Sequence, residues 1–474
     1  MNKLKLFIEN FFVYGVGGII SKIIPLLMVP IITRLMPDTS YFGISDLSNT
    51  IVSFFSAIAM MGMYDAMYRL FFEKEDVNYK KKICSTALFF ATVISVGVFT
   101  LMILFKEKIA TLFFRDIQYS YIVYISAFAT LVSATNGIIA APTRMQNKRK
   151  IYLLTNLMGS VLGYGVAIPL LLQGHYIVAL PVGLAVSAFI LEVVFGVLNH
   201  SWFSMKRIDK KTLKPLLTLG LPLVPNFLIY WIFNSCDKLM ITNLVGLSAT
   251  GIYSAASKIG QISQLIYTAF AGGWQYFAFS TMKEENQIET NSKIFEYLGV
   301  ISFLATTFLC IFSQFIFEIV FPPQYLSGYL IAPYLFLAPL LQMLYQVIGN
   351  QFMVIKKTWP TILILSGGAI INILLNAMLI PILGIVGAAI ATLAGYIVVL
   401  IICIIVLLKM RLMILTKRMV FVFSIMMCFL IAWHLFFPGN ILLGGIAFCG
   451  VVGVYLTLYK KELKYFIKFI SKSK

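Results

Sequence analysis

The feature that most constrains the fold is a near-continuous succession of apolar runs, each about as long as a membrane-spanning helix. A helix needs about 20 mostly apolar residues to cross the hydrocarbon core of a bilayer. Of the 474 residues, 60% are hydrophobic and only 12% are charged, whereas soluble domains carry roughly 25% charged residues. The runs leave room only for loops between them. The sequence therefore excludes a soluble globular protein and a disordered one, and predicts an all-α polytopic membrane protein.

The apolar runs are bounded by charge clusters or by Pro and Gly turns, and they predict about fourteen transmembrane helices. Short connections, such as Gln173–His175, require neighbouring helices to run antiparallel. No run shows the alternating pattern of a membrane β-barrel strand. The predicted spans cover residues 10–35, 41–70, 83–105, 117–141, 151–173, 177–198, 212–243, 248–276, 294–321, 328–354, 359–381, 384–408, 418–437 and 440–459.

The distribution of Lys and Arg predicts the orientation, because cytoplasmic segments of membrane proteins are enriched in these residues. With the N-terminus inside, most of the 37 basic residues fall in inner segments, including the six lysines from Lys460 onward. The outer segments hold only Arg34, Lys106, Lys108 and Arg115. We therefore predict that both termini are cytoplasmic. The net charge of +19 is explained first by this topology and second by contact with anionic lipids. It does not require a nucleic-acid partner.

A weak internal similarity indicates two related halves. The first span ends in TRLM (33–36) ahead of FGIS (42–45), and the seventh ends in TNLV (242–245) ahead of TGIY (250–253). Both pairs run in the same direction by the charge distribution, so the sequence predicts a parallel repeat about an axis along the membrane normal. We expect pseudo-symmetric six-helix lobes in residues 1–200 and 201–410. Residues 411–474 are predicted to hold two extra transmembrane helices and a basic cytoplasmic tail.

Polar and ionisable residues within the spans are the candidate functional residues, because charge at membrane depth is rare and costly. Helical spacing places one polar stripe on the second span and another on the eighth. The repeat puts the two stripes in corresponding positions, so they are predicted to face each other across one central cavity. The candidate substrate-binding residues are Lys22, Arg34, Asp46, Asn49, Ser53, Arg69, Asp237, Lys238, Ser254, Lys258 and Gln261.

Some of these residues have structural roles as alternatives. Arg69 lies four residues after Asp65, a spacing typical of a local ion pair. Asp237 and Lys238 are adjacent near the outer end of the seventh span and point to different faces of the helix. Each of these two side chains either tethers the lobes or extends to the membrane interface.

Lys22, Asp46 and Lys258 lie well inside their predicted spans. They either line a transport cavity or form interhelical salt bridges, such as Lys258 with Asp46. A cavity with more Lys and Arg than acidic residues suits an anionic or amphiphilic substrate, and ammonium groups bind phosphate. The Ser, Thr, Asn and Gln side chains of the stripes supply donors and acceptors for a sugar. A drug exporter or an ion channel uses similar residues, so these patterns alone leave the cargo open.

No sequence motif indicates an enzyme. The sequence contains no P-loop, no HExxH and no Gly-x-Ser-x-Gly motif. Its six cysteines form no CxxC pair and have no nearby histidine at metal-ligand spacing. We therefore predict neither catalysis nor direct ATP coupling, and neither a cofactor nor a metal site.

Short motifs occur in a fixed order along the chain. They are VPIITRLMP (29–37) leading into YFGI (41–44), then GM (62–63) ahead of Ala66 and Arg69, DKLMI (237–241) followed by GIYSAASKI (251–259), and GAAIAT (387–392). Their order and spacing resemble those of bacterial lipid-linked oligosaccharide flippases. These flippases are the polysaccharide transporter family of the multidrug/oligosaccharidyl-lipid/polysaccharide exporter superfamily.

The resemblance implies alternating access and movement of undecaprenyl-pyrophosphate-linked repeat units from the inner to the outer leaflet of the bacterial cytoplasmic membrane. The product that the resemblance implies is O-antigen, capsule or a related polymer. It also implies that Lys22, Arg34 and Lys258 hold the pyrophosphate. Implied partners are the lipid-linked oligosaccharide, membrane lipids, a polysaccharide polymerase with other assembly proteins, and a coupling cation (H⁺ or Na⁺). The alternatives are a multidrug/cation antiporter of the same superfamily, a lipid II-type peptidoglycan-precursor flippase, and a membrane scaffold for a polysaccharide synthase.

Overall fold

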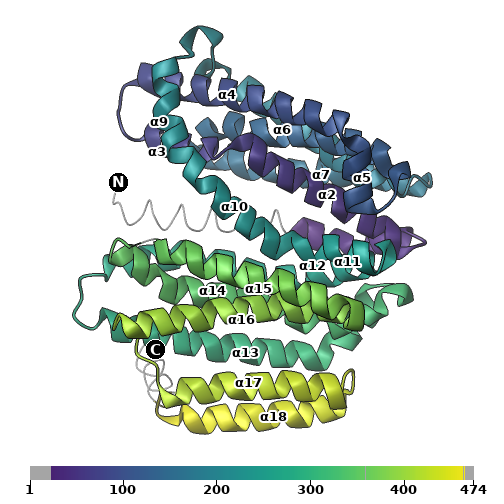
Figure 1. The fold of residues 1–474 in the computed structure, drawn as a ribbon, viewed down its shortest axis with the longest axis vertical. Helices are drawn as coiled ribbons and strands as arrows, with labels where there is room; N and C mark the ends of the chain where they lie inside the picture. Colours follow the sequence, from purple (N-terminus) through teal and green to yellow (C-terminus); the bar gives the residue numbers. More distant parts are fainter. Residues whose placement is uncertain (1–22, 358, 463, 465–474) are drawn as a thin grey trace. The chain divides into compact units, whose positions relative to one another are not determined.

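The computed structural model describes residues 23–357, 359–462 and 464, and within these ranges every regular element is helical (Figure 1). This confirms the predicted all-α class. The helices are Ile23–Leu35, α2 (Thr39–Met60), α3 (Met63–Phe71), α4 (Val77–Leu104), α5 (Lys106–Phe114), α6 (Ser120–Met145), α7 (Arg149–Leu172), α8 (Ala179–Leu198), α9 (Lys210–Gly220), α10 (Val224–Trp231), α11 (Asp237–Leu244), α12 (Leu247–Ser280), α13 (Gln287–Val320), α14 (Ala332–Val354), α15 (Trp359–Leu383), α16 (Ile385–Lys409), α17 (Lys417–Phe436) and α18 (Ile441–Leu458).

Twelve segments of the described chain are long and apolar enough to cross a membrane, so the protein is a multi-pass membrane protein. They coincide with twelve of the predicted spans. The predicted span 248–276 forms α12. The predicted span 10–35 lies partly outside the described residues, and its described part is the helix Ile23–Leu35.

The predicted span 41–70 is not one helix. It breaks between α2 and α3 at Met61 and Gly62, whose φ angles of 46° and 69° are left-handed. A Cβ atom at residue 62 would overlap the carbonyl oxygen of Gly220, so two glycines allow the backbones to touch here. The break was not predicted because its cause lies 158 residues away in the sequence.

The predicted span 212–243 is also interrupted. It consists of α9, α10 and α11, which are joined by a 3₁₀ turn at Leu221–Leu223 and a π-helical turn at Ile232–Cys236. Pro222 removes a backbone donor at the first of these turns. π-helical turns inside helices are often found at functional sites. This one lies directly before Asp237 and Lys238.

By residue contacts the chain forms two compact units. The first contains the described residues up to Ala255 together with Ile373–Ala388. In it α6 packs against α2, α4 and α8, and α7 packs against α8. Its core includes the fully buried side chains of Ile44, Leu47 and Phe114. The predicted division into lobes at residues 200 and 410 follows repeat symmetry rather than contacts, and it stays a prediction.

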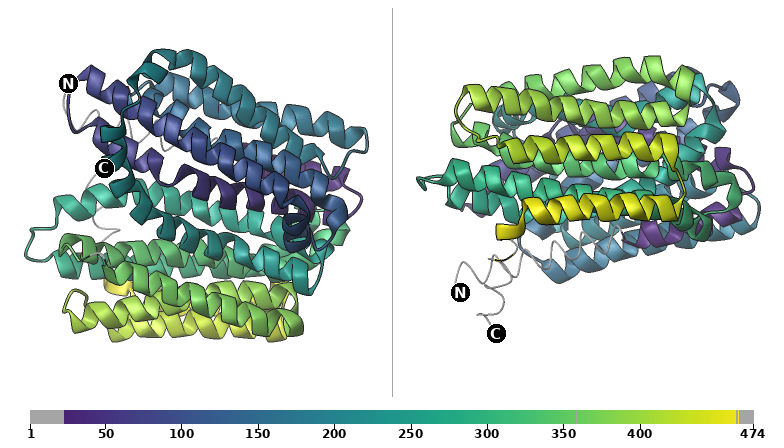
Figure 2. Two further views of the ribbon diagram at one scale, coloured as in Figure 1. Left: turned by 45° about the horizontal axis from the view of Figure 1, so that its top comes forward. Right: turned by 90° about the horizontal axis from the view of Figure 1, so that it is seen from below.

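The second unit contains Ala256–Asn372 and the described residues from Ala389 onward. Here α13 contacts α14, α17 and α18, and the last two helices form a side-by-side pair (Figures 1 and 2). Glu296 of α13 is buried and accepts hydrogen bonds from Arg418 Nε (2.6 Å), Tyr459 (2.6 Å) and Thr416 (3.2 Å). Arg418 also bonds Glu462 at 2.5 Å. This network fixes the C-terminal helix pair to α13.

We expect Glu296→Ala to loosen α17 and α18, because it removes the acceptor that Arg418, Thr416 and Tyr459 share. Breaking a buried ion pair costs roughly 3–5 kcal/mol, so the apparent Tm of the detergent-solubilised protein should fall and the 410–416 loop should become sensitive to protease. Glu289→Ala is the matched control on the same helix, because the pair of Glu289 with Lys293 is more than half exposed and contributes about 0–1 kcal/mol. Equal Tm losses in the two variants would contradict the assignment.

Candidate functional site

The two predicted polar stripes meet at Asp46, inside the first unit. Ser254 of α12 donates a hydrogen bond to Asp46 Oδ2 of α2 at 2.8 Å. Lys238 Nζ of α11 forms an ion pair with the same oxygen at 2.7 Å. Asp46 is 7% exposed and Ser254 is fully buried. One carboxylate therefore joins three helices at membrane depth, and the stripes touch directly at this level.

Asp237 and Tyr253 extend this group. Tyr253 donates its hydroxyl hydrogen to Asp237 Oδ2, and Asp237 Oδ1 accepts a hydrogen bond from the backbone N–H of Lys238 at 2.8 Å. Both side chains are buried. The adjacent residues Asp237 and Lys238 thus bond to α12 and α2 respectively. We refer to Asp46, Asp237, Lys238, Tyr253 and Ser254 as the Asp46 cluster.

Two glycines, where α2 and α12 cross, position the Asp46 cluster. A Cβ atom on Gly43 of α2 would lie 2.6 Å from the carbonyl oxygen of Leu247, and one on Gly251 of α12 would overlap the carbonyl oxygen of Thr39. The two helix backbones are therefore in contact, as small residues permit in membranes. Asp46 and Ser254 each lie three residues after their glycine, on the same helix face. The crossing thus brings a carboxylate and a hydroxyl together.

Beside the cluster, α2 presents a polar surface. Asn49 and Ser53 are the exposed side chains of α2, whose other residues are buried or half-buried. Trp231 of α10 donates a hydrogen bond to the carbonyl oxygen of Thr50 at 3.3 Å, which packs α10 on α2. Asn234, in the π-helical turn after α10, is also exposed. Exposed amide and hydroxyl groups at membrane depth are typical of a water-accessible path rather than a lipid-facing surface.

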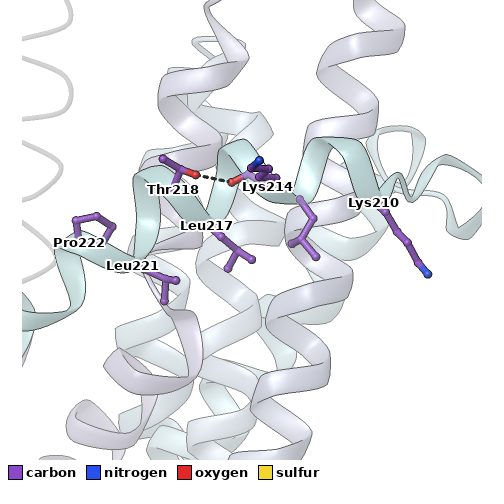
Figure 3. A pocket seen from close by; sticks show the side chains of 7 residues that line it. Lys210, Lys214, Leu217, Thr218, Leu221 and Pro222 are labelled. Carbon is purple, nitrogen blue, oxygen red and sulfur yellow. Dashed lines mark hydrogen bonds between the residues drawn. The ribbon is translucent and has the colours of Figure 1, made fainter.

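The predicted cytoplasmic end of the same interrupted span carries a pocket of about 470 Å³ on α9 (Figure 3). Its lining alternates ammonium and apolar groups along one face of the helix. Asp209 begins α9 by accepting hydrogen bonds from the backbone N–H of Lys211 and the hydroxyl of Thr212, and these bonds hold the pKa of Asp209 below its usual value. The pocket is lined by Lys210, Leu213, Lys214, Leu217, Thr218, Leu221 and Pro222.

Of the other predicted residues, Arg34 and Arg69 lie in the first unit, and Lys258 and Gln261 lie in the second. Arg34 is exposed and donates a hydrogen bond to the carbonyl oxygen of Pro30 at 3.1 Å. Arg69 is exposed at the end of α3. Lys258 is half-buried and Gln261 is exposed, both on the part of α12 in the second unit. Lys22 lies outside the described residues.

Sequence reasoning missed three parts of this site. Tyr253 directly precedes Ser254 and belongs to the motif at 251–259, so that motif was the available signal. Asn234 lacks such a signal, because its exposure depends on the π-helical turn. Lys210 and Lys214 served only as markers of orientation, although their spacing with Leu213 and Leu217 is that of one helix face.

Three comparisons with known proteins bear on this architecture. The model of a family described as polysaccharide biosynthesis protein matches residues 31–329. An uncharacterized membrane protein of Methanocaldococcus jannaschii is 26% identical over 238 residues, which cover 44% of this chain and 45% of that protein. The chain thus spans less than half the length of this curated relative.

Solved membrane transporters share the fold. The lipid II flippase MurJ in an inward closed conformation superposes with a TM-score of 0.71 at 15% identity, covering 94% of this chain and 99% of that one. An inward-facing multidrug resistance MATE family transporter of the MOP superfamily gives a TM-score of 0.65 at 14% identity, covering 83% and 94%. An outward-facing one gives 0.61 at 12% identity, covering 86% and 95%. At these identities the likeness shows the fold.

The family match and the shared fold confirm the resemblance drawn from the sequence motifs. The motifs at 41–44, 62–69, 237–241 and 251–259 lie inside the matched region, the motif at 29–37 overlaps its start, and the motif at 387–392 lies beyond it. That region covers well over half of the 474 residues, and so the chain belongs to the polysaccharide biosynthesis protein family.

Proposed function

We propose that the protein is a flippase that moves undecaprenyl-pyrophosphate-linked oligosaccharide repeat units from the inner to the outer leaflet of the bacterial cytoplasmic membrane. The product would be a surface polysaccharide such as O-antigen or capsule. Membership of the polysaccharide biosynthesis family and the fold of a lipid II flippase support this proposal. The observation that carries it is the Asp46 cluster, which is buried and ionic inside a membrane-spanning bundle.

A buried ion pair contributes little net stability, because desolvation of both charges offsets their attraction. The pair of Asp46 with Lys238 is better explained as a contact that opens and closes. It links α2 of the predicted N-terminal lobe to α11 and α12 of the predicted C-terminal lobe. By the predicted orientation it lies toward the outer side. In our proposal it closes the outer end while the substrate binds from inside, and water replaces its bonds when the lobes rock apart.

The α9 pocket suits the first contact with the substrate. Lys210 and Lys214 offer ammonium groups to a pyrophosphate, and Leu217 and Leu221 offer apolar surface to a polyprenyl chain. The pocket is at the predicted cytoplasmic end of the span that carries Lys238 at its other end. Asn49 and Ser53 of α2 would then supply hydrogen bonds to the sugars. A charged head group does not cross hydrocarbon alone, so this polar path is the protein's contribution.

The pocket can be tested by removing its charges. We expect the double variant Lys210→Gln/Lys214→Gln to lower transport roughly thirtyfold at limiting substrate, because each basic residue near an anionic lipid group contributes about 1 kcal/mol, or about fivefold. Lys211→Gln is the matched control, since Lys211 is exposed on the same turn but does not line the pocket. The rate would be measured at several substrate concentrations, and a loss of the same size in the control would contradict the assignment.

The cargo itself is tested by complementation of a flippase-deficient strain that makes a compatible glycan. The proposal expects wild-type protein to restore surface polymer without changing resistance to cationic drugs. Drug resistance without polymer would favour the multidrug/cation antiporter, and rescue of peptidoglycan synthesis alone would favour a lipid II-type flippase. We further propose that a polysaccharide polymerase consumes the product and that an H⁺ or Na⁺ gradient drives transport. Polymer length and sensitivity to ionophores in the same strain test these two points.

A further inference from the structure

A second groove lies on α4 of the first unit and shares no lining residue with the Asp46 cluster. It has a volume of about 530 Å³ and lies between α4 and the segment 203–208, which connects α8 to α9. Leu88, Phe89, Val93 and Val96 of α4 form one wall, and Phe203 and Met205 form the other. The groove is apolar and runs along three turns of α4. Its mostly apolar lining suits a hydrocarbon chain.

The connecting segment is held firmly against α4. The backbone N–H of Ser204 donates a hydrogen bond to the hydroxyl of Ser85 at 3.0 Å, and the backbone N–H of Asp209 donates to the hydroxyl of Thr86 at 3.1 Å. Ser85 and Thr86 are both buried. The second wall of the groove is therefore fixed at both of its ends by α4.

The length of the groove matches one leaflet. From Ser85 to Val96 the helix rises about 17 Å at 1.5 Å per residue, and half of the hydrocarbon core is about 15 Å. Phe89, Val93 and Val96 are each between 42% and 51% exposed, as lipid-facing side chains are. A phospholipid acyl chain ends near the bilayer midplane, whereas an undecaprenyl chain is much longer than one leaflet. The dimensions therefore favour a phospholipid.

Basic residues adjoin the lining residues at the end of the groove where Ser204 meets Ser85. Lys206 and Arg207 directly follow Met205 in the connecting segment. Lys81 places its ammonium 5.9 Å from the ring centre of Trp202, at the same end of α4. The nearby carboxylate of Asp209 is already engaged by the N–H of Lys211 and the hydroxyl of Thr212. An anionic head group thus fits this end better than a zwitterionic one.

We propose that this groove binds an anionic phospholipid of the predicted cytoplasmic leaflet, with one acyl chain along α4 and its phosphate at Lys206 and Arg207. The segment it contacts joins the two predicted lobes. The bound lipid would therefore stabilise the connection about which the lobes move. This site does not depend on the identity of the transported cargo.

Native mass spectrometry of the full chain with phosphatidylglycerol and phosphatidylcholine tests the site. We expect Lys206→Gln/Arg207→Gln to weaken phosphatidylglycerol binding about ten- to thirtyfold, because each basic residue contributes roughly fivefold. Val93→Trp, which fills the groove, should weaken binding at least fivefold.

The control Lys356→Gln/Lys357→Gln removes an exposed adjacent pair elsewhere on the predicted cytoplasmic side. The control Leu101→Trp adds bulk at an exposed position of α4 outside the groove. Both controls should stay within twofold of wild type.

Photo-crosslinking on the wild-type protein gives a readout that is independent of variant folding. Phosphatidylglycerol with a diazirine on its acyl chain should label residues 85–96 and 203–208. Labelling confined to other helices would overturn the proposal, as would equal binding losses in the variants and their controls. Displacement of the lipid by equimolar undecaprenyl pyrophosphate would also overturn it, because the groove would then belong to the substrate.

Discussion

Replacement of Asp46 by alanine is expected to reduce transport about a hundredfold or more and to lower the Tm of the purified protein. The change leaves the largely buried ammonium of Lys238 without the carboxylate that it contacts at 2.7 Å. Removing one partner of a buried ion pair costs roughly 3–5 kcal/mol. In our proposal this cost falls on the conformation that is closed toward the outside, and each 1.4 kcal/mol changes its population relative to the open one about tenfold. The first effect is measured as transport in membranes that contain equal amounts of each protein. The second is measured as thermal unfolding in detergent.

The control for this prediction is Asp65→Ala on α3. Asp65 is also a carboxylate of the first unit, but it is exposed, so its removal should leave transport within about twofold of wild type. The exchange Asp46→Lys/Lys238→Asp should recover part of the lost Tm, because it restores an ion pair between α2 and α11. If Asp46→Ala transports as well as Asp65→Ala, the cluster has no role in transport.

Changing a gate alters the access of external solvent to the transport path, whereas changing a purely structural contact does not. Asp46→Asn keeps a hydrogen-bond acceptor for Ser254 but removes the charge that attracts Lys238. We expect this variant to open the outer side more often. An Asn49→Cys reporter, on the exposed polar surface of α2, should then react faster with a membrane-impermeant thiol reagent added from outside. Unchanged reactivity in a variant that has lost transport would assign the cluster a structural role.

Gly251→Leu is expected to have the second largest effect, because it separates the backbones of α2 and α12. Even a Cβ atom at residue 251 would overlap the carbonyl oxygen of Thr39, and backbone does not yield as a flexible side chain does. Overpacking of this kind costs about 1–3 kcal/mol. The variant also moves Ser254 away from Asp46. We therefore expect a clear fall in Tm together with loss of transport.

Gly97→Leu on α4 is the matched control for Gly251→Leu. Gly97 lies in a membrane helix, and a Cβ atom there would have no heavy atom within 4 Å. Its replacement should leave Tm unchanged or slightly higher, since glycine is a poor helix former. Gly251→Ala should show a smaller form of the same defect as Gly251→Leu. Retention of wild-type Tm in both Gly251 variants would mean that the backbones of α2 and α12 are not in contact.

The helical spans could be predicted from the sequence because about 20 apolar residues in a row have few alternatives in a bilayer. The interruptions of the predicted spans 41–70 and 212–243 could not be predicted in this way. The break at Gly62 depends on the distant Gly220, and the π-helical turn at Ile232–Cys236 depends on packing. Both positions look apolar and helical in sequence.

The site was predicted in part. Helical periodicity identified Asp46 and Ser254 as corresponding polar residues, and the structure joins them by a hydrogen bond. The ion-pair partner suggested from the sequence was Lys258, and the structure shows Asp46 in an ion pair with Lys238, which the sequence analysis had not paired with it. Spacing within one helix shows which residues share a face, but it does not show which neighbouring helix that face meets. The glycine crossing at Gly43 and Gly251 decides this, and it is a contact between distant parts of the chain.

We propose that this chain moves a lipid-linked oligosaccharide across the membrane through a path closed by the Asp46 cluster. The most direct test is a reconstituted assay in which a fluorescent undecaprenyl-pyrophosphate-linked glycan becomes accessible to an external glycosidase. We predict rapid exposure of the glycan with wild-type protein and with Asp65→Ala, and exposure no faster than in protein-free liposomes with Asp46→Ala. Two results with the wild-type protein would contradict this proposal. One is exposure of the glycan no faster than in protein-free liposomes, and the other is uptake of cationic drugs instead of the glycan.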